Sequence, residues 1–151
     1  MAKFAISLVV ILVLVGMTNA TVKKTPCEGT SDPKYCKEMF GHIDLNTEPN
    51  KWERAVLDTV TKKVTEAKNE VVLVDAKTRH AELHQNCLHQ LTAAIKKLDE
   101  GIIDTAAANV GSCADSYNSD PDVEKSLKSK VDDAYKTAKV GAEFLKKGAP
   151  K

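Results

Sequence analysis

Four cysteines behind a secretory signal constrain this chain more than any other feature. Cys27 and Cys36 lie near the start of the mature chain, and Cys87 and Cys113 lie within amphipathic segments. The sequence contains no other cysteine. An even number of cysteines in an exported protein predicts two structural disulfides. This interpretation removes cysteine chemistry from the functions to be considered.

Residues 1–20 have the features of a signal peptide. Lys3 gives a positive start, residues 4–15 are almost entirely apolar, and residues 18–20 form a small-residue cleavage pattern. We expect cleavage after Ala20 and secretion of the mature chain. An uncleaved anchor is the alternative, but the apolar run is shorter than the ~18 to 20 residues of a membrane span. After cleavage we expect no association with a membrane.

The mature chain is electrically balanced. Cleavage leaves 131 of the 151 residues, and without Lys3 the 22 basic residues fall to 21, equal to the 21 acidic residues. This length provides one domain with a real core. A neutral chain with interspersed charges has no electrostatic reason to bind nucleic acid, and we expect no such partner.

The rest of the chain divides into two parts, an N-terminal hairpin extension with a linker at residues 21–50 and a four-helix bundle at residues 51–151. In the extension, Asp32 is predicted to cap a short helix whose first residue is Pro33. Residues 41–50 read as the linker because they are rich in glycine, proline and asparagine.

Hydrophobic residues recur at steps of three or four along four segments, which predicts four amphipathic helices. The segments are approximately 51–74, 78–100, 104–117 and a fourth that Asp120-Pro121 opens and that reaches about residue 145. Residues 71–74 alone could form a strand, but the sustained period favours a helix. Short connections between four helices predict an all-α, up-down-up-down bundle. The predicted buried positions are Trp52, Val56, Val60, Val64, Ala67, Val71, Val74, Leu83, Cys87, Leu91, Ala94, Leu98, Ala106, Ala107, Val110, Cys113, Ala114, Tyr117, Val123, Leu127, Val131, Ala134, Tyr135, Ala138, Ala142 and Leu145.

The helix lengths favour one disulfide pairing of the three that four cysteines allow. Fourteen residues separate Cys87 from Gly101, and twelve separate Gly101 from Cys113. At 1.5 Å per residue these distances are about 21 Å and about 18 Å, so an antiparallel hairpin brings the two cysteines to nearly the same level. Cys27 and Cys36 can meet over a tight turn. We therefore predict Cys27–Cys36 and Cys87–Cys113.

The chain resembles the plant invertase and pectin methylesterase inhibitor family. Thr25-Pro-Cys-Glu-Gly-Thr-Ser-Asp-Pro-Lys-Tyr-Cys36 is similar to the opening of that family, in which a cysteine is followed by an Asn-Pro or Asp-Pro helix start and a second cysteine beside an aromatic residue. The helix that begins at Cys87 is similar to the family's third-cysteine helix, with an Ala-Ile pair, a later leucine and a terminal glycine. The likeness covers most of the mature chain.

The resemblance implies a secreted inhibitor that occludes the active-site cleft of a carbohydrate-active enzyme. It also implies the apoplast or cell wall as the location, with the vacuole as the less favoured one. Invertase inhibitors of the family insert a Pro-Lys-Phe loop after the hairpin glycine, whereas this chain has Gly101-Ile102-Ile103-Asp104 there. Pectin methylesterase is therefore favoured over invertase as the target. The resemblance implies neither enzyme activity nor a cofactor.

The same turn contains our candidate partner-binding residues, Ile102, Ile103 and Asp104. A hairpin turn usually carries polar side chains, so two isoleucines need either a cover or a partner. Ile103 could instead begin the buried face of the third predicted helix. If Ile102 stays exposed, it is the first candidate for a docking contact.

His80 and His84 stand four residues apart and could share a metal ion on one helix face. The metalloprotease motif needs a glutamate directly after the first histidine, but Ala81 occupies that position. A third ligand would have to be His89 or Glu82. We therefore expect solvated surface histidines, no metal ion and no cofactor.

Other patterns of catalysis are missing from the sequence. It contains no Gly-x-Ser-x-Gly turn, no phosphate-binding loop and no paired-carboxylate cleft. We expect no enzyme activity.

Two alternatives to inhibition remain: an extracellular carrier that holds a small apolar ligand between alanine-rich helices, and a wall interaction protein without inhibitory activity.

Reduction of the two disulfides should lower the melting temperature by many degrees. In the chain-entropy model the loops of the two bridges contribute about 2.7 and about 3.6 kcal/mol, a sum comparable to the net stability of a typical domain. Calorimetry of the oxidised and fully reduced protein measures the shift. An unchanged melting temperature would show that the bridges are not formed or not needed.

Overall fold

The computed structural model describes residues 26–73 and 80–148, which are all-helical and contain no strand. A 3-10 helix, η1 (Pro26–Gly29), and a short helix, α1 (Pro33–Phe40), precede four long helices. The long helices are α2 (Pro49–Leu73), α3 (Ala81–Asp99), α4 (Ile103–Ser119) and α5 (Lys125–Gly148). The predicted signal peptide and the predicted core position Val74 lie outside the described residues.

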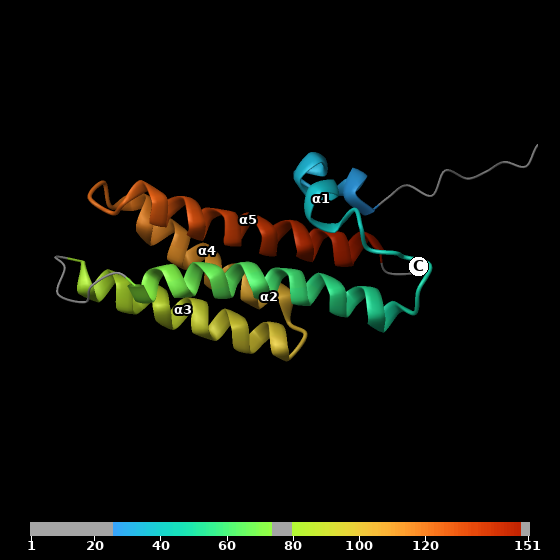
Figure 1. The fold of residues 1–151 in the computed structure, drawn as a ribbon, viewed down its shortest axis with the longest axis horizontal. Coiled ribbons are helices and arrows are strands. Elements are labelled where there is room, and N and C mark those ends of the chain that lie inside the picture. Colours follow the sequence, from blue (N-terminus) through green and yellow to red (C-terminus); the bar gives the residue numbers. More distant parts are fainter. Residues whose placement is uncertain (1–25, 74–79, 149–151) are drawn as a thin grey trace, which may run out of the picture.

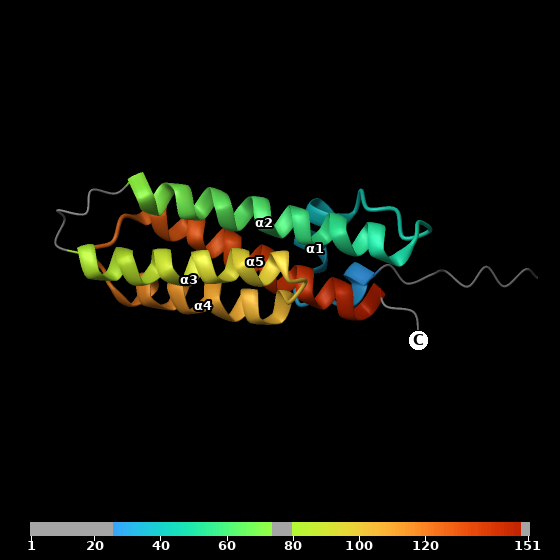
Figure 2. The ribbon, with the colours of Figure 1, turned by 90° about the horizontal axis from the view of Figure 1, so that it is seen from below.

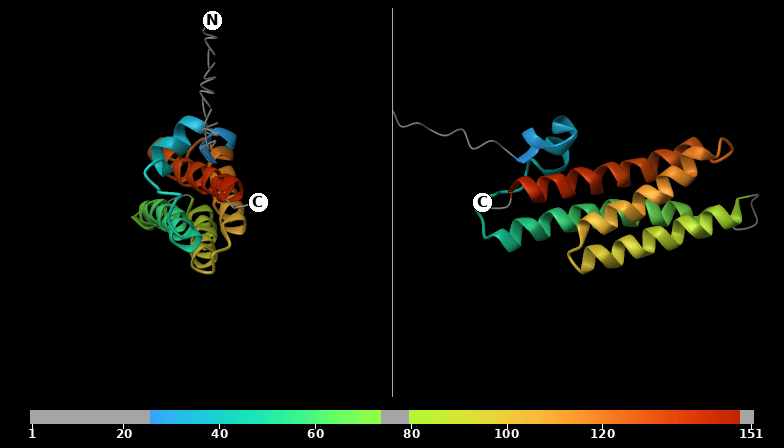
Figure 3. Two further views of the ribbon diagram at one scale, coloured as in Figure 1. Left: turned by 90° about the vertical axis from the view of Figure 1, so that its right-hand side faces the viewer. Right: turned by 180° about the vertical axis from the view of Figure 1, so that it is seen from behind.

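The four long helices form the predicted bundle. Helix α3 packs against α2 and α4, and α5 also packs against α2 and α4, so α2 and α4 lie on one diagonal (Figure 1). The end-on view in Figure 3 shows this bundle with the N-terminal segment outside it. Within the described ranges, no helix combines the length and the apolar character that crossing a bilayer requires.

The predicted hydrophobic positions supply most of the core. Trp52 and every third or fourth residue up to Val71 are buried along α2, and the predicted positions of α3 and α4 are buried except Leu83 and Ala107, which are partly exposed. Tyr117 is fully buried, whereas Tyr135 is partly exposed. The amphipathic period therefore identified the inward faces correctly.

The α3–α4 hairpin turns at Gly101, the described glycine with a left-handed backbone (φ 78°). The amide of Gly101 donates to Leu98 O at 2.9 Å, and the amide of Ile102 donates to Lys97 O at 2.7 Å. These two bonds form a Schellman motif, in which glycine avoids the steric penalty of a Cβ. The turn brings the Cα atoms of Cys87 and Cys113 to 4.7 Å within the predicted disulfide.

The α3–α4 hairpin is shorter than the pair of helices beside it (Figure 2). Helices α2 and α5 have 25 and 24 residues, whereas α3 and α4 have 19 and 17. A Cβ added at Gly141 of α5 would lie 3.3 Å from Ile103 Cδ1, so α4 begins beside this glycine. The last two turns of α5, residues 142–148, therefore extend past the start of α4.

The N-terminal extension covers this protruding part of α5. The aromatic rings of Phe40 and Phe144 lie 5.5 Å apart, and those of Trp52 and Phe144 lie 6.3 Å apart. Phe40, Trp52 and Phe144 are all buried. The extension thus completes the core where the hairpin does not reach.

The extension is built as the sequence predicts. Asp32 Oδ1 accepts the amide N–H of Tyr35 at 3.0 Å, and Pro33 occupies the first turn of α1. The Cys27–Cys36 disulfide is present, with Cα atoms 5.4 Å apart. This bridge ties η1 to α1 at the surface of α5.

The predicted start of the fourth long helix at Asp120-Pro121 is wrong, because α5 begins at Lys125. Asp120 instead ends α4 with an extended backbone, and its Oδ1 accepts the amide of Asp122 at 2.9 Å. Its carboxylate therefore closes a turn over Pro121 and does not cap α5.

Gly141→Ala should destabilise the protein, whereas Gly111→Ala should not. A Cβ at Gly141 would meet Val60 Cγ2 at 2.9 Å and Phe40 Cζ at 3.3 Å, both fully buried. Overpacking costs roughly 1–3 kcal/mol, more than the ~1 kcal/mol that alanine gains in helix propensity. A Cβ at Gly111 would meet Tyr135 Cε2 at 2.9 Å, but that partly exposed ring can move aside.

Urea unfolding of the two variants provides the measurement. We expect Gly141→Ala to be less stable than Gly111→Ala by about 2 kcal/mol. Equal stability of the two variants would contradict close packing at Gly141.

Candidate functional site

The turn between α3 and α4 exposes only part of the predicted partner-binding site. Ile102 is 43% exposed, but Ile103 is only 6% exposed and packs beside Gly141. Ile103 therefore begins the buried face of α4 and is not available to a partner. Asp104 is exposed and forms an ion pair with Lys146 at 2.7 Å.

A continuous surface of short side chains leads away from Ile102 along α4. We call this surface the α4 face and define it by seven of the exposed residues of the helix: Asp104, Thr105, Ala108, Ser112, Asp115, Ser116 and Ser119. Helix α4 contains no lysine or arginine. Short side chains lose little rotamer entropy when they become ordered, so this face can be covered at low entropic cost.

The serines of the α4 face direct their hydroxyl hydrogens back to their own helix. Ser112 Oγ donates to Ala108 O at 3.1 Å, Ser116 Oγ to Ser112 O at 2.8 Å, and Ser119 Oγ to Asp115 O at 2.8 Å. These donors stay satisfied when water is removed, which lowers the cost of desolvation.

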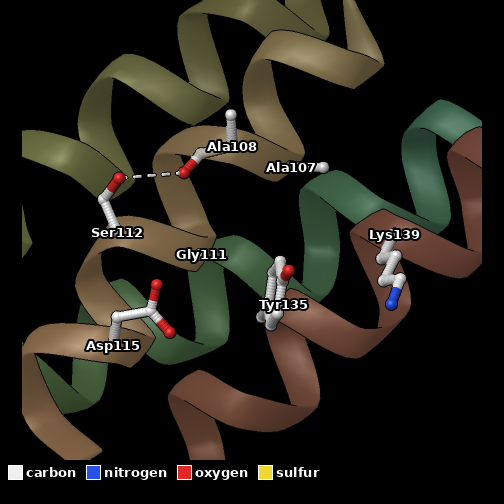
Figure 4. A pocket seen from close by; sticks show the side chains of 7 residues that line it. All are labelled: Ala107, Ala108, Gly111, Ser112, Asp115, Tyr135 and Lys139. Carbon is white, nitrogen blue, oxygen red and sulfur yellow. Dashed lines mark hydrogen bonds between the residues drawn. The ribbon is translucent and has the colours of Figure 1, made fainter. Parts of the chain in front are cut away.

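A shallow groove of about 240 Å³ separates the α4 face from α5 (Figure 4). Its α5 side consists of Tyr135 and Lys139, and its α4 side includes Gly111 and Asp115. Because Gly111 has no side chain, the Tyr135 ring lies directly against α4. The groove thus combines one aromatic ring with a carboxylate and an ammonium group.

A second, more apolar groove lies between α1, the following linker and the end of α5. It has a volume of about 400 Å³ and is bordered by the core residues Phe40 and Phe144. Its lining residues are Pro26, Cys27, Lys37, Phe40, Gly41, Ile43, Leu45 and Phe144.

A polar cluster holds α1 against the bundle. The Tyr35 hydroxyl donates to Asp133 Oδ1 at 2.5 Å and lies 2.7 Å from Thr137 Oγ1, whose own hydroxyl donates to Asp133 O at 2.7 Å. Lys63 of α2 donates to Asp133 Oδ2 at 2.9 Å. Three helices therefore meet at one carboxylate.

The electrostatics of this cluster agree with its geometry. Burial, assisted by the hydrogen bond to Asp133, raises the pKa of Tyr35 to about 12. Burial alone would raise the pKa of Asp133, but hydrogen bonds from Tyr35 and Lys63 lower it. The hydrogen bond to Asp133 raises the pKa of Lys63. The ionised Asp133 and the neutral Tyr35 are thus the forms that the fold favours.

The two predicted surface histidines occupy different environments, and the expectation of solvated side chains is wrong for His84. His84 is 6% exposed and its Nδ1 lies 2.8 Å from the Tyr117 hydroxyl. Burial, together with the nearby His80, lowers the pKa of His84. His80 Nδ1 lies 3.0 Å from Asp120 Oδ2. His89, the third ligand considered from the sequence, is exposed on α3.

The hydrophobic pattern of the sequence did not identify several buried residues of α5. Thr137, Val140 and Phe144 of α5 are buried although they lie off its predicted stripe. The extension covers this second side of α5, and nothing in the period of α5 alone reveals that cover. The Asp-Pro pair before α1 and the nearby aromatic Tyr35 were the only available signals.

Tyr35→Phe should reduce stability at pH 8, because Asp133 and Thr137 lose a hydrogen-bond partner, at a cost of about 1–3 kcal/mol. The folded-state pKa of Tyr35 lies above the unfolded value of about 10. Its contribution is therefore complete below pH 10 and is lost as the pH rises through about 12.

The measurement is the free energy of unfolding in urea at pH 8 and at about pH 11. The difference between wild type and Tyr35→Phe should shrink at the higher pH. A difference that is independent of pH would argue against the hydrogen bonds of the Tyr35 hydroxyl.

We compared the chain with family models, curated proteins and solved structures. No family model matches the chain, and no curated protein or solved structure matches it either.

Proposed function

We propose that the protein is a secreted inhibitor that covers the active-site cleft of a cell-wall carbohydrate-active enzyme, with pectin methylesterase favoured over invertase. The observation that carries the proposal is the architecture around the two disulfides. The Cys87–Cys113 bridge crosslinks the α3–α4 hairpin, and the Cys27–Cys36 bridge crosslinks an extension that packs on α5. This arrangement is the one that the resemblance to the inhibitor family implies.

A preformed surface suits inhibition by occlusion. Crosslinks and the partly buried polar cluster reduce the conformational freedom that a partner would otherwise have to order, and this favours binding. All four cysteines are in disulfides, and the serine hydroxyls of the α4 face are bonded to helix carbonyls. Such a surface acts by shape and charge and forms no covalent bond with its target.

The α4 face, with Ile102 at one end and Tyr135 at its side, is the proposed docking surface. Helix α4 is 17 residues long, or about 26 Å. Together with the rim of α5 it offers a surface suited to an interface of about 800 Å² per partner. Ile102 and Tyr135 are the candidates for anchoring contacts, because large apolar and aromatic side chains dominate binding energy. The acidic α4 and the nearby Lys139 provide charges of both signs at the rim.

The preference for pectin methylesterase rests on the sequence of the turn. Gly101-Ile102-Ile103-Asp104 has neither the proline nor the lysine of the loop with which invertase inhibitors of the family enter their target. The buried Ile103 further limits what this turn can insert into a cleft.

A second candidate function is an extracellular carrier of a small apolar ligand. The groove beside Phe40, Ile43 and Leu45 favours it, because its lining is largely apolar and Leu45 is exposed. The alanines that suggested a cavity between the helices, such as Ala94, Ala106 and Ala138, are fully buried in the core instead. A carrier would therefore hold its ligand at the extension.

Purified, oxidised protein should inhibit pectin methylesterase when added in equimolar amounts and should leave invertase active. Assays of both enzymes over a range of inhibitor concentrations provide the test. If neither enzyme is inhibited, the proposed function is wrong, and displacement of a fluorescent fatty acid then tests the carrier.

Two substitutions test the docking surface. Ile102→Asp removes the exposed apolar contact, and Ala108→Arg places a long side chain in the centre of the α4 face. Each should weaken inhibition at least tenfold, about 1.4 kcal/mol, with an unchanged melting temperature. Asn69→Arg is the matched control, since Asn69 is exposed on α2, the helix diagonal to α4. Full inhibition by Ala108→Arg would remove the α4 face from the interface while leaving inhibition itself intact.

A further inference from the structure

Three potential metal ligands meet at the end of the bundle opposite the extension. His80 directly precedes α3, and Asp120 and Asp122 lie in the turn between α4 and α5. One ligand atom from each of the three side chains lies within 4.8 Å of the others. His80 Nδ1 and Asp120 Oδ2 already lie 3.0 Å apart. The histidine lies 40 positions before Asp120 and 42 before Asp122, so the fold brings this set together.

We propose that His80, Asp120 and Asp122 bind a Zn²⁺ ion. Zinc forms bonds of about 2.0–2.2 Å to imidazole nitrogen and carboxylate oxygen, so ligands around one tetrahedral ion lie about 3.3 Å apart. The His80–Asp120 distance is close to this value. Asp122 is exposed, and rotation of its side chain can close the remaining distance.

The donor set determines which cation fits. Two carboxylates balance the charge of a divalent ion, and the imidazole nitrogen favours zinc over calcium or magnesium, which select oxygen ligands. The set therefore differs from an ordinary acidic surface cluster. Three protein ligands leave one position of a tetrahedral ion for water.

Neighbouring groups hold the ligands in place. Asp120 Oδ1 accepts the amide N–H of Asp122, which leaves Oδ2 directed at His80. Lys128 Nζ donates to the backbone carbonyl of Asp120 and fixes the turn from the α5 side. The buried His84, bonded to Tyr117, packs its ring 6.2 Å from that of His80. Contacts of this kind orient metal ligands and reduce the cost of assembling a site.

Further polar groups surround the site on one side. Glu82 and Asn86 of α3 line the same shallow pocket as His80 and Asp120. Glu82 is exposed in the first turn of α3 and adds negative charge near the cation. Lys128 is the nearby positive charge that opposes binding.

Zinc at this position would connect the start of α3 to the α4–α5 turn. It would add a second link between the start of α3 and the end of α4, about two turns beyond the Cys87–Cys113 bridge. Because zinc would bind the folded protein only, the melting temperature should rise with zinc concentration. This inference is independent of the proposed inhibition.

Calorimetric titration of oxidised, chelator-treated protein with ZnCl₂ tests the proposal. We expect one zinc ion per chain and a higher melting temperature in zinc. His80→Ala and Asp120→Asn should weaken binding at least tenfold, and Asp122→Asn should do the same while keeping the His80–Asp120 contact. His89→Ala is the matched control on α3 and should bind as wild type does.

A spectroscopic measurement separates ligand loss from misfolding. Co²⁺ in place of zinc should give visible d–d absorption in wild type and His89→Ala that is absent in Asp122→Asn, whose melting temperature without metal should be unchanged. Absence of saturable zinc binding at millimolar concentration would overturn the proposal. Binding that survives His80→Ala, or that is lost in His89→Ala, would overturn it as well.

Discussion

Helix α5 is covered on two sides, and the rest of the structure depends on this double cover. One side packs against α2 and α4 in the bundle, and the other packs against η1 and α1. Gly141 lies where these surfaces meet, with Val60, Ile103 and Phe40 around its missing side chain. The absence of a Cβ lets three elements approach one helix at the same level. The part of α5 from Thr137 to Phe144 is thus buried on most sides, although the helix is amphipathic by itself.

The short α3–α4 hairpin makes this cover necessary. Because α4 begins beside Gly141, the last two turns of α5 and the first turns of α2 would expose Trp52 and Phe144 if nothing else packed there. The crosslinked extension supplies Phe40 and Pro26 at that place. The carboxylate of Asp133 then fixes how α1 and α2 are oriented on α5, because it accepts hydrogen bonds from Tyr35 of α1 and Lys63 of α2. Hydrophobic contacts supply most of the stability, and the polar cluster selects one arrangement.

The two ends of the molecule consequently differ in chemistry. The end near residue 101 combines apolar contacts with the Schellman turn, and the α4 face of short side chains starts there and runs along the helix. The other end gathers His80, His84, Tyr117, Asp120 and Asp122, which are polar or titratable. A smooth surface favours recognition of a protein, and a convergent set of nitrogen and oxygen donors favours a cation. The two proposals therefore rest on different residues and do not depend on one another.

Much of the fold could be predicted, because it follows from local periodicity. The stripe from Trp52 to Val71, the cap at Asp32, the turn at Gly101 and both disulfides are confirmed. The candidate site was predicted less well. Ile102 and Ile103 are neighbours in the chain, yet one is exposed and the other buried, because the turn directs them to opposite sides. The start of α5 was placed four residues too early, since an Asp-Pro pair can either cap a helix or close a turn.

The sequence alone determined which residues turn inward along each helix and which cysteines can meet, since both depend on a period of 3.6 residues and on counts along a hairpin. Only the tertiary structure decided what covers the second side of α5 and what lies beside His80. Residues 40 and 144, or 80 and 120, come together through packing between distant segments. The spacing of hydrophobic residues along one helix does not reveal such contacts. They arise from the relative lengths of the helices and from the close approach that one glycine allows.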